Sequence, residues 1–394
     1  MNKVTQGLQP TTEARARLAN WRQAPFNQWA FHHVRELLPT ADIANDPDNV
    51  WSLPEKPLDL SGLPVGDLTL DAFLTRSNAD GFVVIHRGEI VYERYANGMT
   101  LNTPHILMSV SKSMLGLLAG VLASKGILDL DQDISDLIPE LAPTAYAGAT
   151  VHQVIDMRTG VVFAEDYMAT SGPIITYRKA TGWNELEPGE TASDLHSFYA
   201  ELTERDRPHG GRFHYISPNT DLAGWAIERA AGRPFAELMS EYIWQPLGAR
   251  RSAYITVDRL GAPRAAGGMC TTTRDLALVG QLLLQKGARD GREIVPASWI
   301  DSLMTEGDNE AWLAGVLAPY FPSRDMHYRA KWYIERGATP SMAALGIHGQ
   351  SLLVDPKREL VIAKHSSQAL PMDEELIKLT NIAKAALRSH FDKA

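Results

Sequence analysis

The stretch LMSVSKSMLGLLAGVLASK, Leu107–Lys125, decides the fold of this chain. Its apolar residues occupy nearly every face of a helix, and a helix that is apolar all round lies in a protein interior. Gly116, Ala119 and Gly120 leave room for neighbouring elements to approach closely. We therefore expect a buried helix over this range.

Ser109 and Lys112 stand at the start of this helix, three residues apart and so on one face. A helix N-terminus places backbone N–H groups and the positive end of the helix dipole beside the serine oxygen. Apolar surroundings disfavour the charged form of the lysine, so that it can act as a base. This is the Ser-x-x-Lys arrangement of serine acyl-transfer enzymes, and the chain contains it once. The alternative is a serine that caps the helix and a lysine that reaches solvent.

Strand patterns occupy both ends of the chain, and helical patterns occupy the middle. Phe82–Tyr95 consists of two β-rich runs around Arg87-Gly88, which predicts a hairpin. Further strands are expected over 328–334, 346–354 and 360–365, and helices over 151–157, 193–203, 220–231, 234–244, 271–286 and 373–390. We expect an α/β (α+β) fold, with an α/β domain of residues 61–142 and 266–394, an inserted all-α domain of residues 143–265, and an arm of residues 1–60 packed on the fold.

Composition and charge exclude several other classes of protein. The 394 residues are 44% hydrophobic and 22% charged, as in ordinary globular proteins, and the net charge of −9 gives no nucleic-acid footprint. The chain has no run of about 18 apolar residues that could span a membrane. Met1–Ala30 lacks the apolar core of a secretory signal, so we expect a cytoplasmic protein. The single cysteine, Cys270, excludes an internal disulfide.

No metal or cofactor is expected. The chain contains neither of the glycine-rich loops that cradle nucleotide phosphates, Gly-x-x-x-x-Gly-Lys and Gly-x-Gly-x-x-Gly, and no His-Glu-x-x-His zinc motif. It also lacks Gly-x-Ser-x-Gly, the nucleophile turn of α/β-hydrolases.

Two further motifs could complete a site around Ser109. YISPN, Tyr215–Asn219, precedes a predicted helix, and a tyrosine next to a lysine cation can pass a proton to a leaving group. GIHGQ, Gly346–Gln350, leads into a predicted strand, where glycine permits a substrate to approach and a backbone N–H can complete an oxyanion hole. The alternatives are a tyrosine at a helix entry and a kink at a strand entry.

The order and spacing of the three motifs resemble the serine β-lactamase and penicillin-binding-protein superfamily, in its class C and family VIII carboxylesterase branch. Within that superfamily the chain is most similar to the 6-aminohexanoate-dimer (nylon oligomer) hydrolases. The resemblance implies a class C β-lactamase-like fold over residues 60–390. Its matching stretches are LMSVSKS at 107–113, NQWAF at 27–31, Asp166-Tyr167, Gly182-Trp183, YIWQPL at 242–247, ITVD at 255–258 and GIHGQ at 346–350.

The resemblance also implies a role for individual residues. Ser109 would be the nucleophile, Lys112 its base and Tyr215 the relay that protonates the leaving group. The backbone N–H groups of Ser109 and Ile347 would form the oxyanion hole. Tyr167 lies in the loop that in the nylon hydrolases holds an extra leaving-group tyrosine. The residues expected to contact substrate are Tyr167, Trp183, Ser217, Asn219, Trp332, His348 and Gly349.

The chain departs from the family pattern at three places. The lysine of Lys-Thr-Gly is missing, because Ala344 or Ile347 stands at its position. A cation for a β-lactam carboxylate is therefore absent from this strand, and we expect little β-lactamase activity. Tyr-x-Asn is Tyr-x-Ser here. The run Tyr177-Arg178-Lys179 is basic where a substrate with a free ammonium would need a carboxylate, which disfavours linear aminohexanoate oligomers.

These observations predict a serine hydrolase that cleaves small amides or esters through a covalent acyl-enzyme, similar to the 6-aminohexanoate-dimer hydrolases. One alternative is a carboxylesterase with weak or no amidase or β-lactamase activity. Another is a non-catalytic, penicillin-binding-like ligand binder. The expected partner is a small-molecule substrate, with neither nucleic acid nor membrane, and a homodimer is left open.

Overall fold

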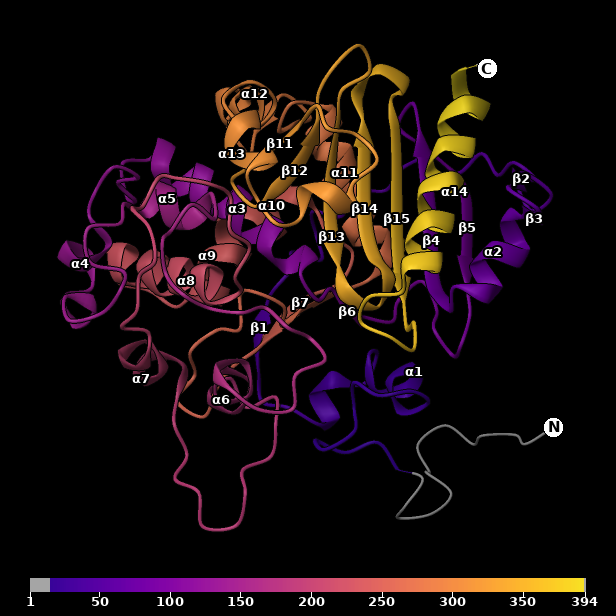
Figure 1. The fold of residues 1–394 in the computed structure, drawn as a ribbon. Helices are drawn as coiled ribbons and strands as arrows, with labels where there is room; N and C mark the ends of the chain where they lie inside the picture. The colour runs from indigo at the N-terminus through magenta and orange to yellow at the C-terminus, as the bar shows by residue number, and fades with distance from the viewer. Residues whose placement is uncertain (1–14, 393–394) are drawn as a thin grey trace.

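The centre of the molecule is a seven-stranded antiparallel sheet to which both ends of the chain contribute (Figure 1). The structure, a computed structural model, describes residues 15–392. The strand order is β11-β12-β13-β14-β15-β4-β5. These strands are β4 (Ala79–His86), β5 (Glu89–Tyr95), β11 (Met326–Arg329), β12 (Trp332–Glu335), β13 (Ser341–Gly346), β14 (Gln350–Asp355) and β15 (Leu360–Ser366).

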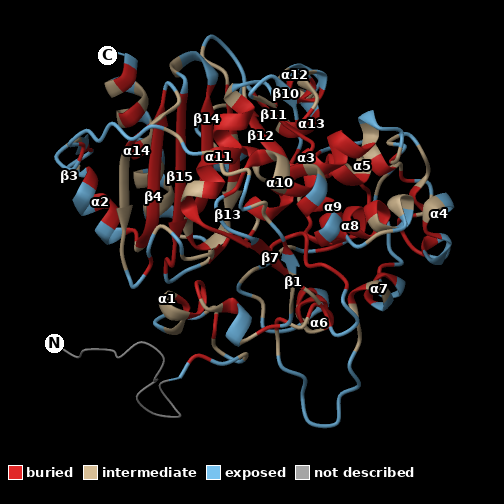
Figure 2. Ribbon diagram, turned by 180° about the vertical axis from the view of Figure 1, so that it is seen from behind, coloured by how far each residue is buried: buried red, intermediate tan, exposed pale blue. Residues whose placement is uncertain are grey.

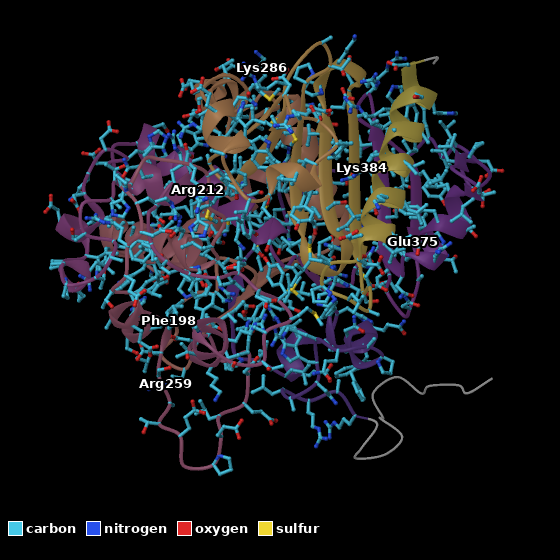
Figure 3. The ribbon with its side chains drawn as sticks, viewed as in Figure 1. Phe198, Arg212, Arg259, Lys286, Glu375 and Lys384 are labelled. Carbon is cyan, nitrogen blue, oxygen red and sulfur yellow. The ribbon has the colours of Figure 1, made fainter. Side chains whose placement is uncertain are left out.

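Helices cover both faces of this sheet. The helices α3 (Val110–Ser124) and α11 (Thr273–Leu284) pack on one face, and α2 (Leu70–Arg76) and α14 (Glu374–Asp392) pack on the other. The central strands are therefore buried on both faces, as the colouring of Figure 2 shows. An ion pair between Arg76 and Glu375 joins α2 to α14, where Figure 3 marks Glu375 and Lys384.

The predicted central helix and hairpin are confirmed. All but the last two residues of α3 are buried, because the helix lies between the sheet and the helical part of the chain. The turn between β4 and β5 consists of Arg87 and Gly88 with φ of +51° and +77°. Positive φ at both central residues gives a tight turn whose twist matches the strands.

Two strand predictions need correction. Residues 328–334 were expected to form one strand, but Ala330 and Lys331, with φ of +44° and +70°, make a turn that separates β11 from β12. Residues 346–354 were also expected to form one strand. Gly346 instead ends β13, a short turn at Ile347–Gly349 follows, and β14 begins at Gln350.

The middle of the chain is mainly helical. Its helices are α5 (Val151–Ile155), α6 (Pro173–Ala180), α7 (Leu195–Phe198), α8 (Pro218–Ala231), α9 (Phe235–Met239), a π-helical turn (Ser240–Trp244) and α10 (Gln245–Leu247), and α4 (Ile134–Leu137) comes just before them. The expectation of an all-α segment over 143–265 is wrong in one respect, because this segment also contains β7 (Ala253–Thr256). One continuous hydrophobic core joins this helical part to the sheet through α3.

A second sheet attaches the N-terminal arm to the rest of the molecule. Its order is β1-β7-β8-β6, with β1 (Thr40–Ile43) from the arm, β6 (His105–Ile106) and β8 (Met269–Thr271). The arm also contains α1 (Phe26–Ala30) and a 3-10 turn (Val34–Glu36). Figure 1 shows α1 and α6 at the same end of the molecule. Residues 1–14 of the predicted arm lie outside the described residues.

The remaining elements are short. They are β2 (Pro64–Val65), β3 (Leu68–Thr69), β9 (Ala288–Arg289), β10 (Arg292–Glu293), α12 (Ala297–Thr305) and α13 (Asn309–Leu313). Across residues 15–392, no helix is both long enough and apolar enough to cross a bilayer.

Candidate active site

Ser109 occupies the N-cap position of α3, where the chain turns sharply from β6 into the helix. The residue before it, Met108, has a φ of +46°, a conformation that is costly for a residue with a side chain. Lys112 lies one helical turn further on, and its Nζ is 3.0 Å from Ser109 Oγ. Ser109 is half-buried and Lys112 is only 1% exposed, so the lysine lies beneath the serine.

Three oxygen atoms surround the amine of Lys112. Besides Ser109 Oγ, they are Ser217 Oγ at 3.1 Å and the carbonyl oxygen of Ala266 at 2.6 Å. Burial lowers the pKa of Lys112 to about 7, with nearby Glu165 opposing the shift and Arg264 adding to it. A lysine in this environment is partly neutral at physiological pH.

Glu165 lies on the opposite side of this network, and the sequence motifs do not predict it as a site residue. Its carboxylate accepts hydrogen bonds from the backbone N–H of Ser217 at 2.7 Å and from Ser217 Oγ at 2.5 Å. The signal in the sequence that could have identified Glu165 is its position two residues before Tyr167, which was itself predicted for the site.

Two tyrosines lie between the serine and this carboxylate. The phenol of Tyr215 lies next to Ser109 and Tyr167, and the phenol of Tyr167 lies next to Glu165. The Lys112 amine lies 5.0 Å from the centre of the Tyr215 ring. Burial raises the pKa of both tyrosines above the ordinary value, so both are neutral phenols at neutral pH.

The turn after β13 lies against the backbone of the serine. A Cβ atom added to Gly346 would be 2.8 Å from the carbonyl oxygen of Leu107 and 3.1 Å from the nitrogen of Ser109. Only glycine permits this approach. The next residue, Ile347, lines the same pocket as Ser109.

This pocket is narrow and open to solvent: its empty space is about 420 Å³, of which the centre of a water molecule can reach about 30 Å³. Five of the residues expected from sequence line it: Ser109, Tyr167, Trp183, Ser217 and Ile347. The other lining residues are Arg22, Met108, Glu165, Ile174, Tyr177, Arg178, Arg264, Ala266 and Gly267.

Four residues expected to contact substrate do not line this pocket. Asn219 is buried, where its side chain accepts from the Tyr146 hydroxyl and donates to Thr159, holding the start of α8. Trp332 is fully buried in the hydrophobic core beneath the sheet.

The other two belong to the turn after β13. His348 is 1% exposed, with its Nδ1 2.7 Å from the carbonyl oxygen of Gln368 and its ring packed edge to face with Phe31. Gly349 has a φ of +88° and leaves space for the side chain of Gln368. Both residues shape the turn that presents Ile347.

The described residues contain no group of three or more histidine, cysteine, aspartate or glutamate side chains placed to hold a metal ion. Cys270 is buried with a free thiol. The chemical groups at the site are therefore hydroxyls, an amine, one carboxylate and guanidinium groups.

The sequence model of the family named Beta-lactamase matches residues 70–387. The chain belongs to this family. It is a hydrolase with the β-lactamase fold, in a family of serine hydrolases whose members include amidohydrolases and esterases.

Within this family, the chain is similar to several individual proteins and solved structures. It is 35% identical over 350 residues to the 6-aminohexanoate-dimer hydrolase of Paenarthrobacter ureafaciens, covering 89% of this chain and 88% of that protein. It is also similar to a Bacillus anthracis structure assigned as a 6-aminohexanoate-dimer hydrolase, with a TM-score of 0.87, 28% identity, and coverage of 98% of this chain and 99% of that one.

A family VIII carboxylesterase shares the fold, with a TM-score of 0.57, 17% identity, and coverage of 80% of this chain and 96% of that one. The family resemblance and the fold class predicted from sequence are thus confirmed, and so is the prediction that the protein is a serine hydrolase.

Proposed function

We propose that the protein hydrolyses small amides or esters through an acyl-enzyme on Ser109. The observation that carries the proposal is the 3.0 Å contact between Ser109 Oγ and Lys112 Nζ, made by a buried amine whose pKa is about 7. A serine hydroxyl is a weak nucleophile until a base removes its proton. A neutral lysine at this distance is such a base.

The hydrogen-bond network supports this direction of proton transfer. The Ala266 carbonyl can only accept, so Lys112 donates to it. Ser217 gives its own proton to the carboxylate of Glu165, so its oxygen accepts the second proton of Lys112. A neutral amine has two protons and one lone pair, so the lone pair faces Ser109. Glu165 thereby orients the lysine through Ser217.

The proposed reaction gives a role to the serine, to the two backbone N–H groups and to the two tyrosines. Ser109 Oγ attacks the substrate carbonyl while its proton moves to Lys112. The backbone N–H groups of Ser109 and Ile347 stabilise the negative charge on the carbonyl oxygen. As the bond to the acyl group breaks, Tyr215 donates its proton to the leaving amine or alcohol and receives in turn the proton that Lys112 took from Ser109, assisted by Tyr167. Water then hydrolyses the acyl-enzyme by the same route.

The relatives supply the first substrates to try. The 35% identity to a 6-aminohexanoate-dimer hydrolase supports linear amides of that size. An esterase without amidase activity is the second candidate, supported by the 25% identity over 189 residues to Esterase EstB of Burkholderia gladioli. A non-catalytic binder is disfavoured, because Ser109, Lys112 and Tyr215 are all present, with the Lys112 amine 3.0 Å from Ser109 Oγ and 5.0 Å from the centre of the Tyr215 ring.

A fluorophosphonate probe tests the proposal directly, because it reacts with activated serines. We expect labelling of Ser109, located by peptide mass mapping. Ser109→Ala should abolish labelling and lower kcat for p-nitrophenyl esters by about a thousandfold or more. Ser171→Ala, at an exposed serine, is the matched control. Labelling that survives Ser109→Ala would exclude this serine as the nucleophile.

The compartment and the assembly remain predictions from sequence. We propose a cytoplasmic protein, which cell fractionation would test, and light scattering would distinguish a monomer from a homodimer.

A further inference from the structure

Three arginine side chains from distant parts of the chain line the pocket that contains Ser109. Arg22 comes from the N-terminal arm, Arg178 from α6 and Arg264 from the loop before β8. A pocket with three guanidinium groups has an excess of positive charge unless carboxylates balance it.

Arg264 is balanced by an acidic partner. It forms a buried ion pair with Asp221, whose carboxylate also accepts hydrogen bonds from the backbone N–H of Ala266, at 2.7 Å, and from the hydroxyl of Tyr177. Its guanidinium stacks 5.0 Å from the centre of the Trp183 ring. This arginine is a fixed structural part of the pocket wall.

Arg22 has no such partner. No carboxylate of the described residues lies within 4.0 Å of its guanidinium nitrogens, and its Nε is buried without a hydrogen-bond partner. It donates one hydrogen bond, to Asn184 Oδ1 at 2.5 Å, and lies 5.9 Å from the centre of the Trp183 ring on which Arg264 also stacks. The N-terminal arm therefore places the guanidinium of Arg22 in the pocket with no carboxylate of the described residues paired to it.

Arg178 is also without an ion-pair partner among the described residues, although it is only 9% exposed. Among the described residues, its guanidinium donates one hydrogen bond, to the backbone carbonyl of Tyr167 at 3.1 Å. The neighbouring Lys179, by contrast, points to the surface and pairs with Glu190 at 2.6 Å. Of the basic run at 177–179, Arg178 is the charge that reaches the pocket.

One carboxylate, that of Glu165, is found among the described residues that line the pocket. It is already engaged by Ser217 and Tyr167, and its charge also acts on Arg178. With Lys112 neutral and Asp221 paired to Arg264, Arg22 and Arg178 share this single carboxylate, so one positive charge remains uncompensated. Burial, followed by repulsion from Arg178 and Arg264, lowers the pKa of Arg22 to about 9, and burial lowers the pKa of Arg178. Unpaired charges in such a place are costly, and an anion would remove that cost.

We propose that Arg22 and Arg178 form an anion subsite that holds a carboxylate of the substrate, so that the preferred substrates are amides or esters carrying a carboxylate group. The inference rests on the proposed hydrolase function and narrows its substrate class. Guanidinium groups present paired N–H donors that fit a carboxylate. The cation missing from the strand at Ala344 is thus supplied from the arm and from α6.

Binding of adipate and of adipamide, its neutral analogue, tests the subsite without catalysis. Tryptophan fluorescence reports binding, because Trp183 and Trp21 lie beside Arg22. We expect the wild-type protein to bind adipate at least tenfold more tightly than adipamide. Arg22→Gln combined with Arg178→Gln should bring the two affinities within threefold. Arg324→Gln, at an exposed arginine that does not line the pocket, is the control and should keep the preference.

Two outcomes would overturn the proposal: equal affinity of the wild-type protein for both compounds, or a preference that survives the double substitution. Thermal unfolding of each variant shows that it is folded. Arg22→Lys combined with Arg178→Lys keeps both charges and should restore part of the preference. If the glutamine variant is unfolded, the lysine variant tests the proposal instead. Ammonium groups cannot form the paired hydrogen bonds that guanidinium groups make to a carboxylate, so the preference for adipate should be measurably smaller than in the wild-type protein.

Hydrolysis separates this inference from the proposed function. The ratio of kcat/KM for the mono-p-nitrophenyl ester of adipate to that for its methyl ester reports a carboxylate on the acyl side. The same ratio for 4-acetoxyphenylacetate and its methyl ester reports the leaving-group side. If Ser109 cleaves the neutral esters but neither ratio exceeds threefold, the subsite is excluded and the hydrolase stands. If adipate binds through the arginines but no ester is cleaved, the hydrolase is excluded and the subsite stands.

Discussion

The protonation state of Lys112 sets the pH range in which the proposed mechanism can work. Its pKa is lowered by burial to about 7, so the amine is protonated below this pH and free to accept a proton above it. We expect kcat/KM for a p-nitrophenyl ester to rise about tenfold per pH unit below 7 and to level off above it. A profile that is flat between pH 5.5 and 8.5 would contradict the assignment of the base.

Tyr167 distinguishes amide from ester cleavage. Amines are poor leaving groups that need a proton, whereas p-nitrophenolate leaves without one. We expect Tyr167→Phe to lower amide hydrolysis by more than tenfold and to leave p-nitrophenyl ester hydrolysis within tenfold, about 1.4 kcal/mol. Tyr320→Phe, at an exposed tyrosine, is the control. Equal losses on both substrates would show that Tyr167 supports the site without protonating the leaving group.

The site residues differ in how well the sequence could identify them. Ser109 and Lys112 could be found because one helical turn brings them together, whatever the rest of the chain does. Arg22 and Arg264 could not, since 242 residues separate them and their shared contact with Trp183 exists only after folding. His348 stands inside a recognisable motif, yet its ring turns away from the pocket because Gln368 offers it a carbonyl.

The position of α3 depends on close contact with the β11–β12 turn. A Cβ atom on Gly116 would lie 2.0 Å from the carbonyl oxygen of Ala330. We expect Gly116→Ala to lower the free energy of unfolding by about 1–3 kcal/mol, because the overpacking outweighs the better helix propensity of alanine. Chemical denaturation measures this. Gly62→Ala, where a Cβ atom meets nothing within 4 Å, is the control, and equal stability of the two variants would show that the turn moves freely.

Helices and strands, like single residues, differ in how well local sequence predicts them. The local residue pattern predicts the hairpin at Phe82–Tyr95 and the helix α3, and the structure confirms both. The turn at Ala330 and Lys331 was missed, because neither residue favours a positive φ by itself and the carbonyl of Ala330 is held there by packing on α3. β7 was missed because it becomes a strand by pairing with β1 and β8.

Buried histidines make the stability of the whole molecule sensitive to acid. Burial lowers the pKa of His32, His214 and His348 to about 4 each, whereas an unfolded histidine titrates near 6.5. Between these values the unfolded chain binds more protons, so stability falls as pH falls below about 6.5. We expect each histidine to lower the free energy of unfolding by on the order of 1 kcal/mol as the pH falls from 7 to 5, measured by denaturation at constant ionic strength.

Glu228 should change the free energy of unfolding with pH in the opposite direction to the histidines, and so provides a control. Burial raises its pKa to about 7, so the folded protein holds this proton between about 4.5 and 7 and gains stability as pH falls through that range. Glu228→Gln should therefore make the loss of stability on acidification steeper. An unchanged free energy of unfolding between pH 7 and 5 in both proteins would contradict the histidine account.

The pairing of β15 with β4 has a consequence for synthesis of the chain. Residues 360–366 form the neighbour of residues 79–86 in the middle of the sheet. On a ribosome, the β4–β5 hairpin therefore emerges long before the strand that covers its inner edge. Until residues 360–366 have been translated, that edge stays open to other strands. Chaperone capture of the nascent hairpin would thus protect the chain in the interval between synthesis of the two strands.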